Sequence, residues 1–336
     1  MKEREIRPDG MKRKYIELSV QDAKLYFSEF KSRNLNCVAC DSNNTEEEFI
    51  KEDFSYSVCR DCGTLYQTPR PALAEYEAFY RNSKSSKYWS EVFYPAVAEI
   101  RREKIIRPRV EALLSMCNDR NLKVDKLIDV GAGYGIFLDE WRKKMPETEL
   151  IAIEPSVHLA KECVNKKLKV VNSIVENVKE YDNYADLIVC FEVLEHVDSP
   201  LEFLKTMKKM LRPGGYLFIS TLCIDGFDLQ TLWDKSSQIS PPHHINFHSI
   251  KGFEKLFERL GLEDINITTP GLIDVDIVKN FIKTHDVDYL KNDRFLSFIL
   301  ADQEKSDLFQ NFLQENKLSS HAWVIGKKPE KIAHKI

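Results

Sequence analysis

Short apolar runs alternate with longer helical patterns from about residue 125 to the end of the chain. The run from Leu187 to Phe191 is almost wholly apolar, which is typical of a parallel strand buried on both faces. Strands that alternate with helices predict an α/β fold with a mainly parallel sheet. Seven runs are predicted to contain the strands: LIDV (127–130), LIAIEPS (150–156), LKVVNS (168–173), ADLIVCFEVLEHV (185–197), YLFIST (216–221), EDINITT (263–269) and SSHAWVIGKKP (319–329).

The pattern divides the chain into three parts. We expect residues 1–71 to form an N-terminal helix and a small cysteine-containing module, and residues 72–120 a helical linker or lid rich in aromatic residues. Residues 121–336 are expected to form the α/β domain. Two insertions are predicted in that domain, at 222–248 after the fifth strand and at 276–316 between the sixth and seventh strands.

Composition places the chain among ordinary globular proteins. Of its 336 residues, 43% are hydrophobic and 30% are charged, which is sufficient for a sizeable core. The chain has no run of about 18 apolar residues that would predict a membrane span. Its first residues, MKEREIRPDG, lack the apolar stretch of a secretion signal, so we expect a cytoplasmic protein. The net charge of −4 argues against a nucleic-acid partner, which usually requires a basic face.

Four of the eight cysteines form two Cys-x-x-Cys pairs, Cys37/Cys40 and Cys59/Cys62, which are separated by 18 residues. This spacing is typical of a zinc site, because the two-residue gap lets both thiolates of a pair reach one ion. Four thiolates leave no open coordination position, so the Zn²⁺ would be structural and the segment a zinc ribbon. The alternatives are a redox pair or independent core cysteines. The other four cysteines are scattered and are expected to stay reduced.

A glycine-rich turn follows the first predicted strand of the α/β domain. Gly131, Gly133 and Gly135 lie between that strand and a helical pattern, which is the first unit of a Rossmann-like sheet. The second strand ends at Glu154, about twenty residues further on. An acid at this position can accept hydrogen bonds from both hydroxyls of a ribose. The alternative for Glu154 is an ordinary surface acid at a strand end.

Four stretches, LIDVGAGYG, IAIEP, FEVLEHV and LRPGGYLFIST, resemble in this order the class I S-adenosylmethionine (SAM)-dependent methyltransferases. The resemblance covers about residues 100–265. It implies a Rossmann-like seven-stranded sheet in the order 3-2-1-4-5-7-6 and SAM as cofactor. It also implies a set of cofactor-binding residues: Gly131, Gly133 and Gly135 beside the methionine part, Glu154 at the ribose, Asn172, Ser173 and Ile174 along the adenine, Phe191 and Glu192 below the sulfonium, and Asp129 as the family's acid in the first strand.

Segments outside the sheet resemble a narrower group. CRDCGTLYQTPRP before the α/β domain and TTPGLIDVDIV after its sixth strand are similar to bacterial methyltransferases that carry an N-terminal zinc-binding module. Several of these enzymes act in sugar-nucleotide or surface-polysaccharide pathways. The resemblance implies a small-molecule acceptor such as a nucleotide-linked sugar.

Three histidines lie in the insertion that follows the fifth strand, in the stretch ISPPHHINFHS. This insertion leaves the sheet at its carboxyl edge, where open α/β sheets bind ligands, and Glu195 and His196 leave the fourth strand at the same edge. We expect His243, His244 or His196 to serve as a general base, with Glu195 beside it. A divalent metal site and a purely structural loop are the alternatives, and for His248 we expect the structural role.

The chain is therefore interpreted as a SAM-dependent methyltransferase with a structural zinc module and a small-molecule substrate. An RNA methyltransferase that uses the zinc ribbon to bind nucleic acid is a second interpretation. A non-catalytic SAM-binding interaction module is a third, which the intact glycine triplet and Glu154 disfavour.

Overall fold

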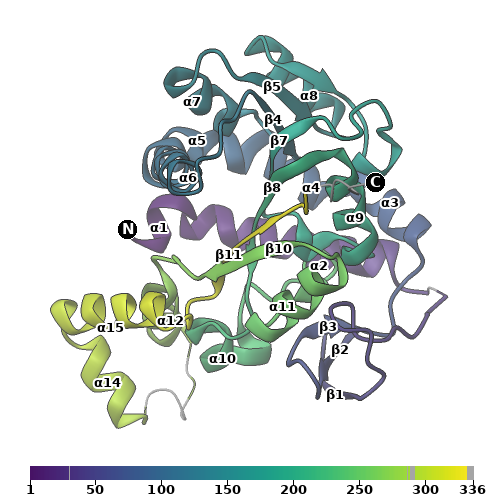
Figure 1. Ribbon diagram of the computed structural model, residues 1–336. Helices are drawn as coiled ribbons and strands as arrows, with labels where there is room; N and C mark the ends of the chain where they lie inside the picture. The colour runs from purple at the N-terminus through teal and green to yellow at the C-terminus, as the bar shows by residue number, and fades with distance from the viewer. Residues whose placement is uncertain (30, 286, 288–291, 331–336) are drawn as a thin grey trace. The chain divides into compact units, whose positions relative to one another are not determined.

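A computed structural model describes residues 1–29, 31–285, 287 and 292–330 (Figure 1). The chain forms two compact units. The first unit comprises Met1–Phe93, Leu222–Gly252 and Ile267–Trp323. The second comprises Tyr94–Thr221, Phe253–Asn266 and the described residues from Val324 on. The units are treated one at a time.

The predicted Rossmann-like sheet is present, with seven strands in the order β10-β11-β8-β7-β4-β5-β6. This order corresponds to the predicted 3-2-1-4-5-7-6, which is confirmed. The inner strands are parallel, and Ile128 pairs with Ile151 on one side and with Ile188 on the other. The strands are β4 (Lys126–Val130), β5 (Glu149–Ile153), β6 (Lys169–Val171), β7 (Ala185–Phe191), β8 (Leu211–Leu222), β10 (Glu263–Thr268) and β11 (His321–Lys327).

Helices of the second unit follow the strands as the α/β alternation predicts. α7 packs against β5, and α8 packs against β5 and β6. The apolar face of α9 is buried at Phe203, Leu204 and Met207. The helical segments are α5 (Tyr94–Arg101), the π-helical η2 (Arg102–Ile106), α6 (Arg107–Asp119), α7 (Ile136–Lys144), α8 (Val157–Asn165), α9 (Pro200–Met210) and α11 (Ile250–Arg259), whose first residues belong to the first unit.

A second, four-stranded sheet lies in the first unit. Its strands are β1 (Thr45–Lys51), β2 (Phe54–Cys59), β3 (Leu65–Gln67) and β9 (Asn246–Phe247), in that order. β1, β2 and β3 are consecutive and antiparallel, as short strands around two cysteine pairs would be. β9 comes from the histidine stretch and pairs antiparallel with β3. Part of the insertion after β8 is therefore a strand of the cysteine-containing sheet.

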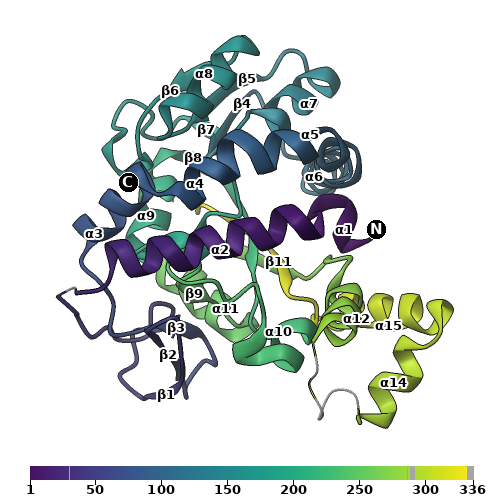
Figure 2. The ribbon, with the colours of Figure 1, turned by 180° about the vertical axis from the view of Figure 1, so that it is seen from behind.

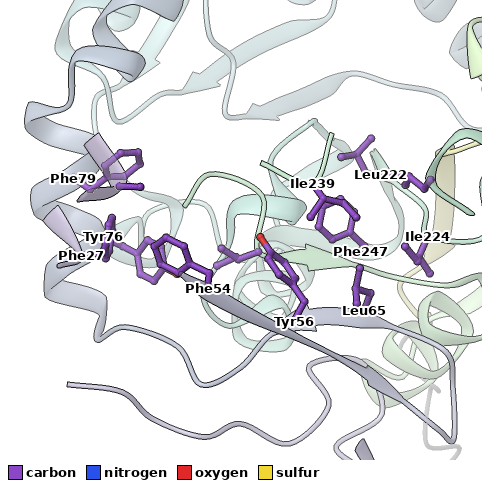
Figure 3. Close-up of a cluster of buried hydrophobic side chains, with 13 residues drawn as sticks. Phe27, Phe54, Tyr56, Leu65, Tyr76, Phe79, Leu222, Ile224, Ile239 and Phe247 are labelled. Carbon is purple, nitrogen blue, oxygen red and sulfur yellow. The ribbon is translucent and has the colours of Figure 1, made fainter. Parts of the chain in front are cut away.

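A buried cluster joins this sheet to the N-terminal helices (Figure 3). It includes Phe27, Phe54, Tyr76 and Phe79, and Phe27 makes ring contacts with the other three. The long helix α2 packs against α3 and α4 (Figure 2). The bounds of these helices are α2 (Asp9–Tyr26), α3 (Leu73–Asn82) and α4 (Lys84–Tyr88), with a short α1 (Glu3–Ile6) before them and a π-helical segment (Trp89–Phe93) after them.

The predicted insertion between the sixth and seventh strands is helical. It contains α12 (Asp274–Thr284), α14 (Arg294–Leu300) and α15 (Gln303–Glu315), and α12 packs against α10 (Phe227–Leu232). No helix within the described ranges is both long and apolar enough to cross a membrane.

Candidate active site

Gly131, Gly133 and Gly135 form the turn after β4, and all three have left-handed backbone. Their surroundings differ. A Cβ at Gly131 would lie 2.6 Å from Cγ2 of Val193, and a Cβ at Gly135 would lie 2.7 Å from Cδ1 of Leu168. These two glycines permit close packing within the protein. A Cβ at Gly133 would meet no atom within 4 Å, so Gly133 borders open space. A ligand that passes over the turn would pass at Gly133.

Glu154 follows β5 and is hydrogen-bonded to the main chain of this turn. It is 5% exposed, and its Oε2 accepts a hydrogen bond from the Gly133 N–H at 2.8 Å. Its Oε1 accepts from the Ser156 N–H at 2.8 Å. Burial raises the pKa of Glu154, while these two N–H donors lower it. Each carboxylate oxygen keeps a lone pair for a further donor, so the ribose role predicted for Glu154 is chemically feasible.

Asp129 lies inside β4 and is almost completely buried. Its Oδ1 has no hydrogen-bond partner among the residues that the structure describes. Burial, and secondly the charge of Glu154, raises the pKa of Asp129 to about 8, while Arg109 lowers it. A buried carboxylate oxygen without a donor is costly unless a ligand supplies one. The ammonium group of SAM is such a donor, so Asp129 and the open space at Gly133 both fit this cofactor.

Arg109 of α6 is a site residue that the sequence did not reveal. It is 5% exposed, and its Nη2 lies 3.3 Å from Oε1 of Glu192. Its guanidinium is 4.6 Å from the ring centroid of Phe191, at the end of β7. Ser220 donates a second hydrogen bond to Oε1 of Glu192. Phe191 and Glu192, both predicted near the sulfonium, are thus fixed by a buried cation.

Tyr134, inside the glycine motif, was also missed. Its ring is stacked on Tyr94 of α5, with centroids 5.1 Å apart and an interplanar angle of 4°. The guanidinium of Arg101 lies 5.4 Å from the Tyr94 ring. Tyr134 stands between two of the predicted glycines, so its position in the motif was the available signal. The sequence offered no signal for Arg109, because α6 lies before the glycine motif and the number of residues between them follows no known pattern.

The residues predicted along the adenine lie at the end of β6. Asn172 donates from Nδ2 to the carbonyl oxygens of Glu154 and Pro155, at 2.8 and 3.0 Å. Ser173 is half-buried and Ile174 is exposed. Their role toward adenine stays a prediction.

The predicted catalytic residues fall into both units. Glu195 and His196 lie in the second unit, on a 3-10 turn (Leu194–His196) after β7. Glu195 is 2% exposed, and its Oε2 accepts from Oγ1 of Thr221 at 2.7 Å. Burial, followed by the charge of Glu192, raises the pKa of Glu195 to about 8. Burial thus favours the neutral form of the Glu195 carboxyl.

His243 and His244 lie in the first unit, and His243 is deeply packed. It is 4% exposed, and its Nε2 lies 3.2 Å from Oγ of Ser85. Its ring is surrounded by aromatic rings, with centroid distances of 5.3 Å to Tyr15, 4.9 Å to Phe79 and 6.0 Å to Tyr80. Such packing restricts access to the imidazole.

His244 is half-buried and is held at both its ring and its main chain. Its Nδ1 lies 2.6 Å from the carbonyl oxygen of Gln238, and its own carbonyl accepts from the Tyr56 hydroxyl at 2.7 Å. His248 is completely buried, and burial together with the positive charge of Arg70 lowers its pKa to about 3. A neutral, buried His248 is in keeping with the structural role expected for it.

The four cysteines of the two pairs converge in the first unit. Their sulfurs all lie within 4.8 Å of one another, and the Cys37–Cys62 and Cys40–Cys59 distances are 3.5 Å. The pairs have matching turns, in which the N–H of Asp41 bonds to the Cys37 carbonyl and that of Gly63 to the Cys59 carbonyl, both at 2.8 Å. Thiolates around tetrahedral zinc lie about 3.8 Å apart, because each Zn–S bond is about 2.3 Å. The donor set therefore fits Zn²⁺.

The other four cysteines, Cys117, Cys163, Cys190 and Cys223, are buried and form no disulfide.

Comparison with known proteins agrees with this geometry. A family model described as a methyltransferase domain matches residues 97–267. A ubiquinone biosynthesis O-methyltransferase of Aliivibrio fischeri is 33% identical over 119 residues, which are 31% of this chain and 47% of that protein. A tRNA U34 carboxymethyltransferase of Helicobacter acinonychis is 31% identical over 167 residues, 46% of this chain and 63% of that protein. The matches thus span less than two thirds of either relative.

Among solved structures, phosphoethanolamine N-methyltransferase 2 of Haemonchus contortus, in complex with SAM, is similar with a TM-score of 0.49 and 14% identity. The similarity covers 79% of this chain and 63% of that chain. The family model covers just over half of the chain and contains the glycine turn, Glu154 and the strands β4 to β8. The chain belongs to the class I SAM-dependent methyltransferases.

Proposed function

We propose that this chain transfers a methyl group from SAM to a small-molecule acceptor. The observation that carries the proposal is the cofactor cradle at β4 and β5. There Gly133 borders open space, Asp129 has a buried oxygen to which no described residue donates, and Glu154 bonds the main chain of the turn. The ammonium and ribose hydroxyls of SAM would supply donors to these carboxyl oxygens, which supports cofactor binding at this turn.

Each residue of the cradle would contact a different part of the cofactor. Glu154 would accept from the ribose hydroxyls, and Asp129 would accept from the ammonium of the methionine part. Phe191 and Glu192, held by Arg109, would border the sulfonium. SAM, when bound, supplies an electrophilic methyl carbon, so the protein needs mainly to orient the acceptor and remove its proton.

His244 is the proposed general base. The carbonyl of Gln238 can only accept a hydrogen bond, so Nδ1 of His244 carries the hydrogen and the neutral ring has its lone pair on Nε2. As the acceptor atom bonds to the methyl carbon, its proton passes to Nε2. The electron pair of the broken carbon–sulfur bond stays on sulfur. The deep aromatic packing of His243 supports His244 rather than His243 in this role.

The cysteine cluster is proposed to hold one structural Zn²⁺ through Cys37, Cys40, Cys59 and Cys62. Four sulfurs within 4.8 Å and two matching turns support this assignment. Four thiolates fill the coordination sphere, so the ion takes no part in methyl transfer.

A nucleotide-linked sugar or another surface-polysaccharide precursor is the proposed acceptor. The likeness of CRDCGTLYQTPRP and TTPGLIDVDIV to bacterial methyltransferases with a zinc module supports it. A tRNA acceptor is the second candidate, because one relative is named a tRNA U34 carboxymethyltransferase. The net charge of −4 weighs against tRNA, since affinity for nucleic acid comes largely from Lys and Arg contacts to phosphates.

The test is methyl transfer from radiolabelled SAM to three acceptor classes: sugar nucleotides, catechols that resemble ubiquinone precursors, and unmodified tRNA. The proposal predicts incorporation into a sugar nucleotide. Incorporation into tRNA alone would favour the second candidate, and binding of S-adenosylhomocysteine (SAH) without transfer to any class would favour a binding module.

A further inference from the structure

The ring of His244 is bonded to Gln238, which is itself anchored by a buried polar network. The His244 Nδ1–H donates to the Gln238 carbonyl oxygen at 2.6 Å. Gln238 is 6% exposed, and its main-chain N–H is 3.2 Å from Oγ of Ser236. The position of this carbonyl therefore depends on what holds the side chain of Gln238.

That side chain ends on a buried carboxyl group. Nε2 of Gln238 donates to Oδ2 of Asp228 on α10 and lies 3.5 Å from Oγ of Ser320. Asp228 is completely buried. A glutamine amide can donate in this way whether Asp228 is a carboxylate or a neutral carboxylic acid, so the protonation state must be found from the other neighbour of Asp228.

Asp274 of α12 is 1% exposed and is one of the groups that act on Asp228: besides burial, its charge raises the pKa of Asp228, while the side chain of Ser320 lowers it. Asp274 is surrounded by donors. Its Oδ1 accepts from the Ser320 N–H at 2.6 Å, and its Oδ2 accepts from Oγ of Ser319 at 2.7 Å and from Nε2 of Gln310 at 2.8 Å. With three donors on its two oxygens, Asp274 is the hydrogen-bond acceptor of the two carboxyl groups.

Because Asp274 already accepts three hydrogen bonds, a proton on the Asp228 carboxyl is the arrangement that gives these two buried groups the least repulsion. Burial, and secondly the charge of Asp274, raises the pKa of Asp228 to about 8. Neutral Asp228 then donates to Asp274 and accepts from Gln238. Asp228 thus holds the side-chain amide of Gln238, and the main-chain carbonyl oxygen of the same residue accepts from His244.

We propose that Gln238 is a positioning residue that fixes His244 in the Nδ1–H tautomer, and that neutral Asp228 holds Gln238 in place for this task. This inference rests on the proposed function, in which Nε2 of His244 takes the acceptor's proton. A fixed tautomer keeps the lone pair on that nitrogen. Its structural content, the tautomer of His244, can be measured without any substrate.

The experiment compares Asp228→Asn with Asp228→Ala. Asparagine matches neutral aspartic acid, because its amide oxygen can accept from Gln238 and its NH₂ can donate to Asp274. Alanine removes both bonds. Gln230→Ala is the matched control, since Gln230 lies on the same helix and donates at 2.9 Å to the carbonyl of Ile224 instead. Gln238→Leu is the second variant if Asp228→Ala fails to fold.

The readout is the two-bond ¹⁵N–¹H spectrum of the imidazoles in the full chain, with the His244 signals assigned from their loss in His244→Ala. We expect wild type, Asp228→Asn and Gln230→Ala to give the Nδ1–H pattern. Asp228→Ala and Gln238→Leu should give a mixture of tautomers. A pure Nδ1–H pattern in Gln238→Leu, or a mixture in Asp228→Asn, would overturn the inference.

Kinetics separate this inference from the proposed function. Where the tautomer becomes mixed, kcat should fall about tenfold or more while the KM for SAM stays constant, as for other residues that orient a functional imidazole. A mixed tautomer with undiminished kcat would support the role of Gln238 and refute His244 as the base. A lower kcat with an unchanged tautomer would refute the role of Gln238.

Discussion

Leu65 of β3 pairs antiparallel with Phe247 of β9. Leu65 lies three residues after Cys62 in the chain, and Phe247 lies three residues after His244. The two segments are also joined where Oγ of Ser249 donates to the carbonyl oxygen of Cys62. The histidine stretch is therefore built onto the cysteine turns by main-chain pairing. Order in the stretch depends on order in those turns.

Removal of the proposed zinc should loosen both segments. Zinc binding contributes folding free energy to small thiolate modules, so its loss exposes the paired strands. Cys59→Ala is expected to abolish zinc binding, lower Tm, and increase hydrogen exchange of the amides at 54–67 and 243–249. Elemental analysis should find one zinc per chain in the wild type.

The control for this variant is Cys223→Ala, which removes a buried cysteine of the same unit outside the cluster. Its zinc content should equal that of the wild type. Equal zinc content in Cys59→Ala and wild type would refute the four-cysteine site.

The glycines of the cradle should separate stability from cofactor binding. In Gly131→Ala, the new Cβ would lie 2.6 Å from Val193, and overpacking together with the left-handed backbone should cost about 2–4 kcal/mol. In Gly133→Ala, the new methyl group meets no protein atom, so only the backbone cost of about 1–2 kcal/mol applies.

The affinity for SAH should rank the two variants in the opposite order: Gly131→Ala loses more stability, and Gly133→Ala loses more affinity. The comparison is made at a temperature where both variants are folded. Gly133→Ala is expected to weaken SAH much more than Gly131→Ala does, by calorimetry below both transition temperatures. If Gly133→Ala binds SAH like the wild type, the open space at Gly133 is not the cofactor path.

Glu154→Ala should weaken SAH by about 1.5–3 kcal/mol, the range for a lost hydrogen bond to a charged group. Glu162→Ala is the matched control, since Glu162 lies on α8 in the same unit and its carboxylate is ion-paired with Lys166 at 4.0 Å. Isothermal titration calorimetry would measure both. Equal losses in the two variants would show that Glu154 does not hold the ribose.

The parallel sheet could be predicted from the sequence because its signals are local. Apolar runs such as Leu187 to Phe191, glycines after the first strand and an acid after the second each depend on a few neighbouring residues. The cysteine pairs could be predicted for the same reason. The two-residue gap lets both cysteines of a pair face one ion, and the pairing of β1 with β2 brings the two pairs together.

β9 could not be predicted, because two residues form a strand only through pairing with β3, about 180 residues earlier. Arg109 likewise lies 83 residues before Glu192, and Asp228 lies on a separate helix from Asp274, so neither contact follows a local pattern in the sequence. The histidine stretch was recognised as unusual, but the sequence could not separate His243, packed among aromatic rings, from His244, held by Gln238.

Stability should depend on pH through Asp228. Its pKa is raised by burial to about 8 in the folded chain, against about 3.9 when unfolded. Between these values the folded state binds one more proton than the unfolded state, so stability falls as pH rises, by up to about 1.4 kcal/mol per pH unit.

Asp228→Asn removes this titration and should flatten the dependence. Urea unfolding between pH 5 and pH 8 is the measurement, and the stability of Asp228→Asn relative to wild type should improve steadily with rising pH. Parallel curves for the two proteins would place the shared proton elsewhere than on Asp228.

Methyl transfer itself tests the central claim most directly. The measurement is incorporation of label from methyl-labelled SAM into a sugar nucleotide by wild type and His244→Ala, with SAH affinity determined for both. We predict transfer by the wild type, and a kcat lower by about 10²–10⁴-fold in His244→Ala at unchanged SAH affinity. Undiminished transfer by His244→Ala would contradict the base assignment, and a wild-type chain that fails to bind SAH would contradict the account as a whole.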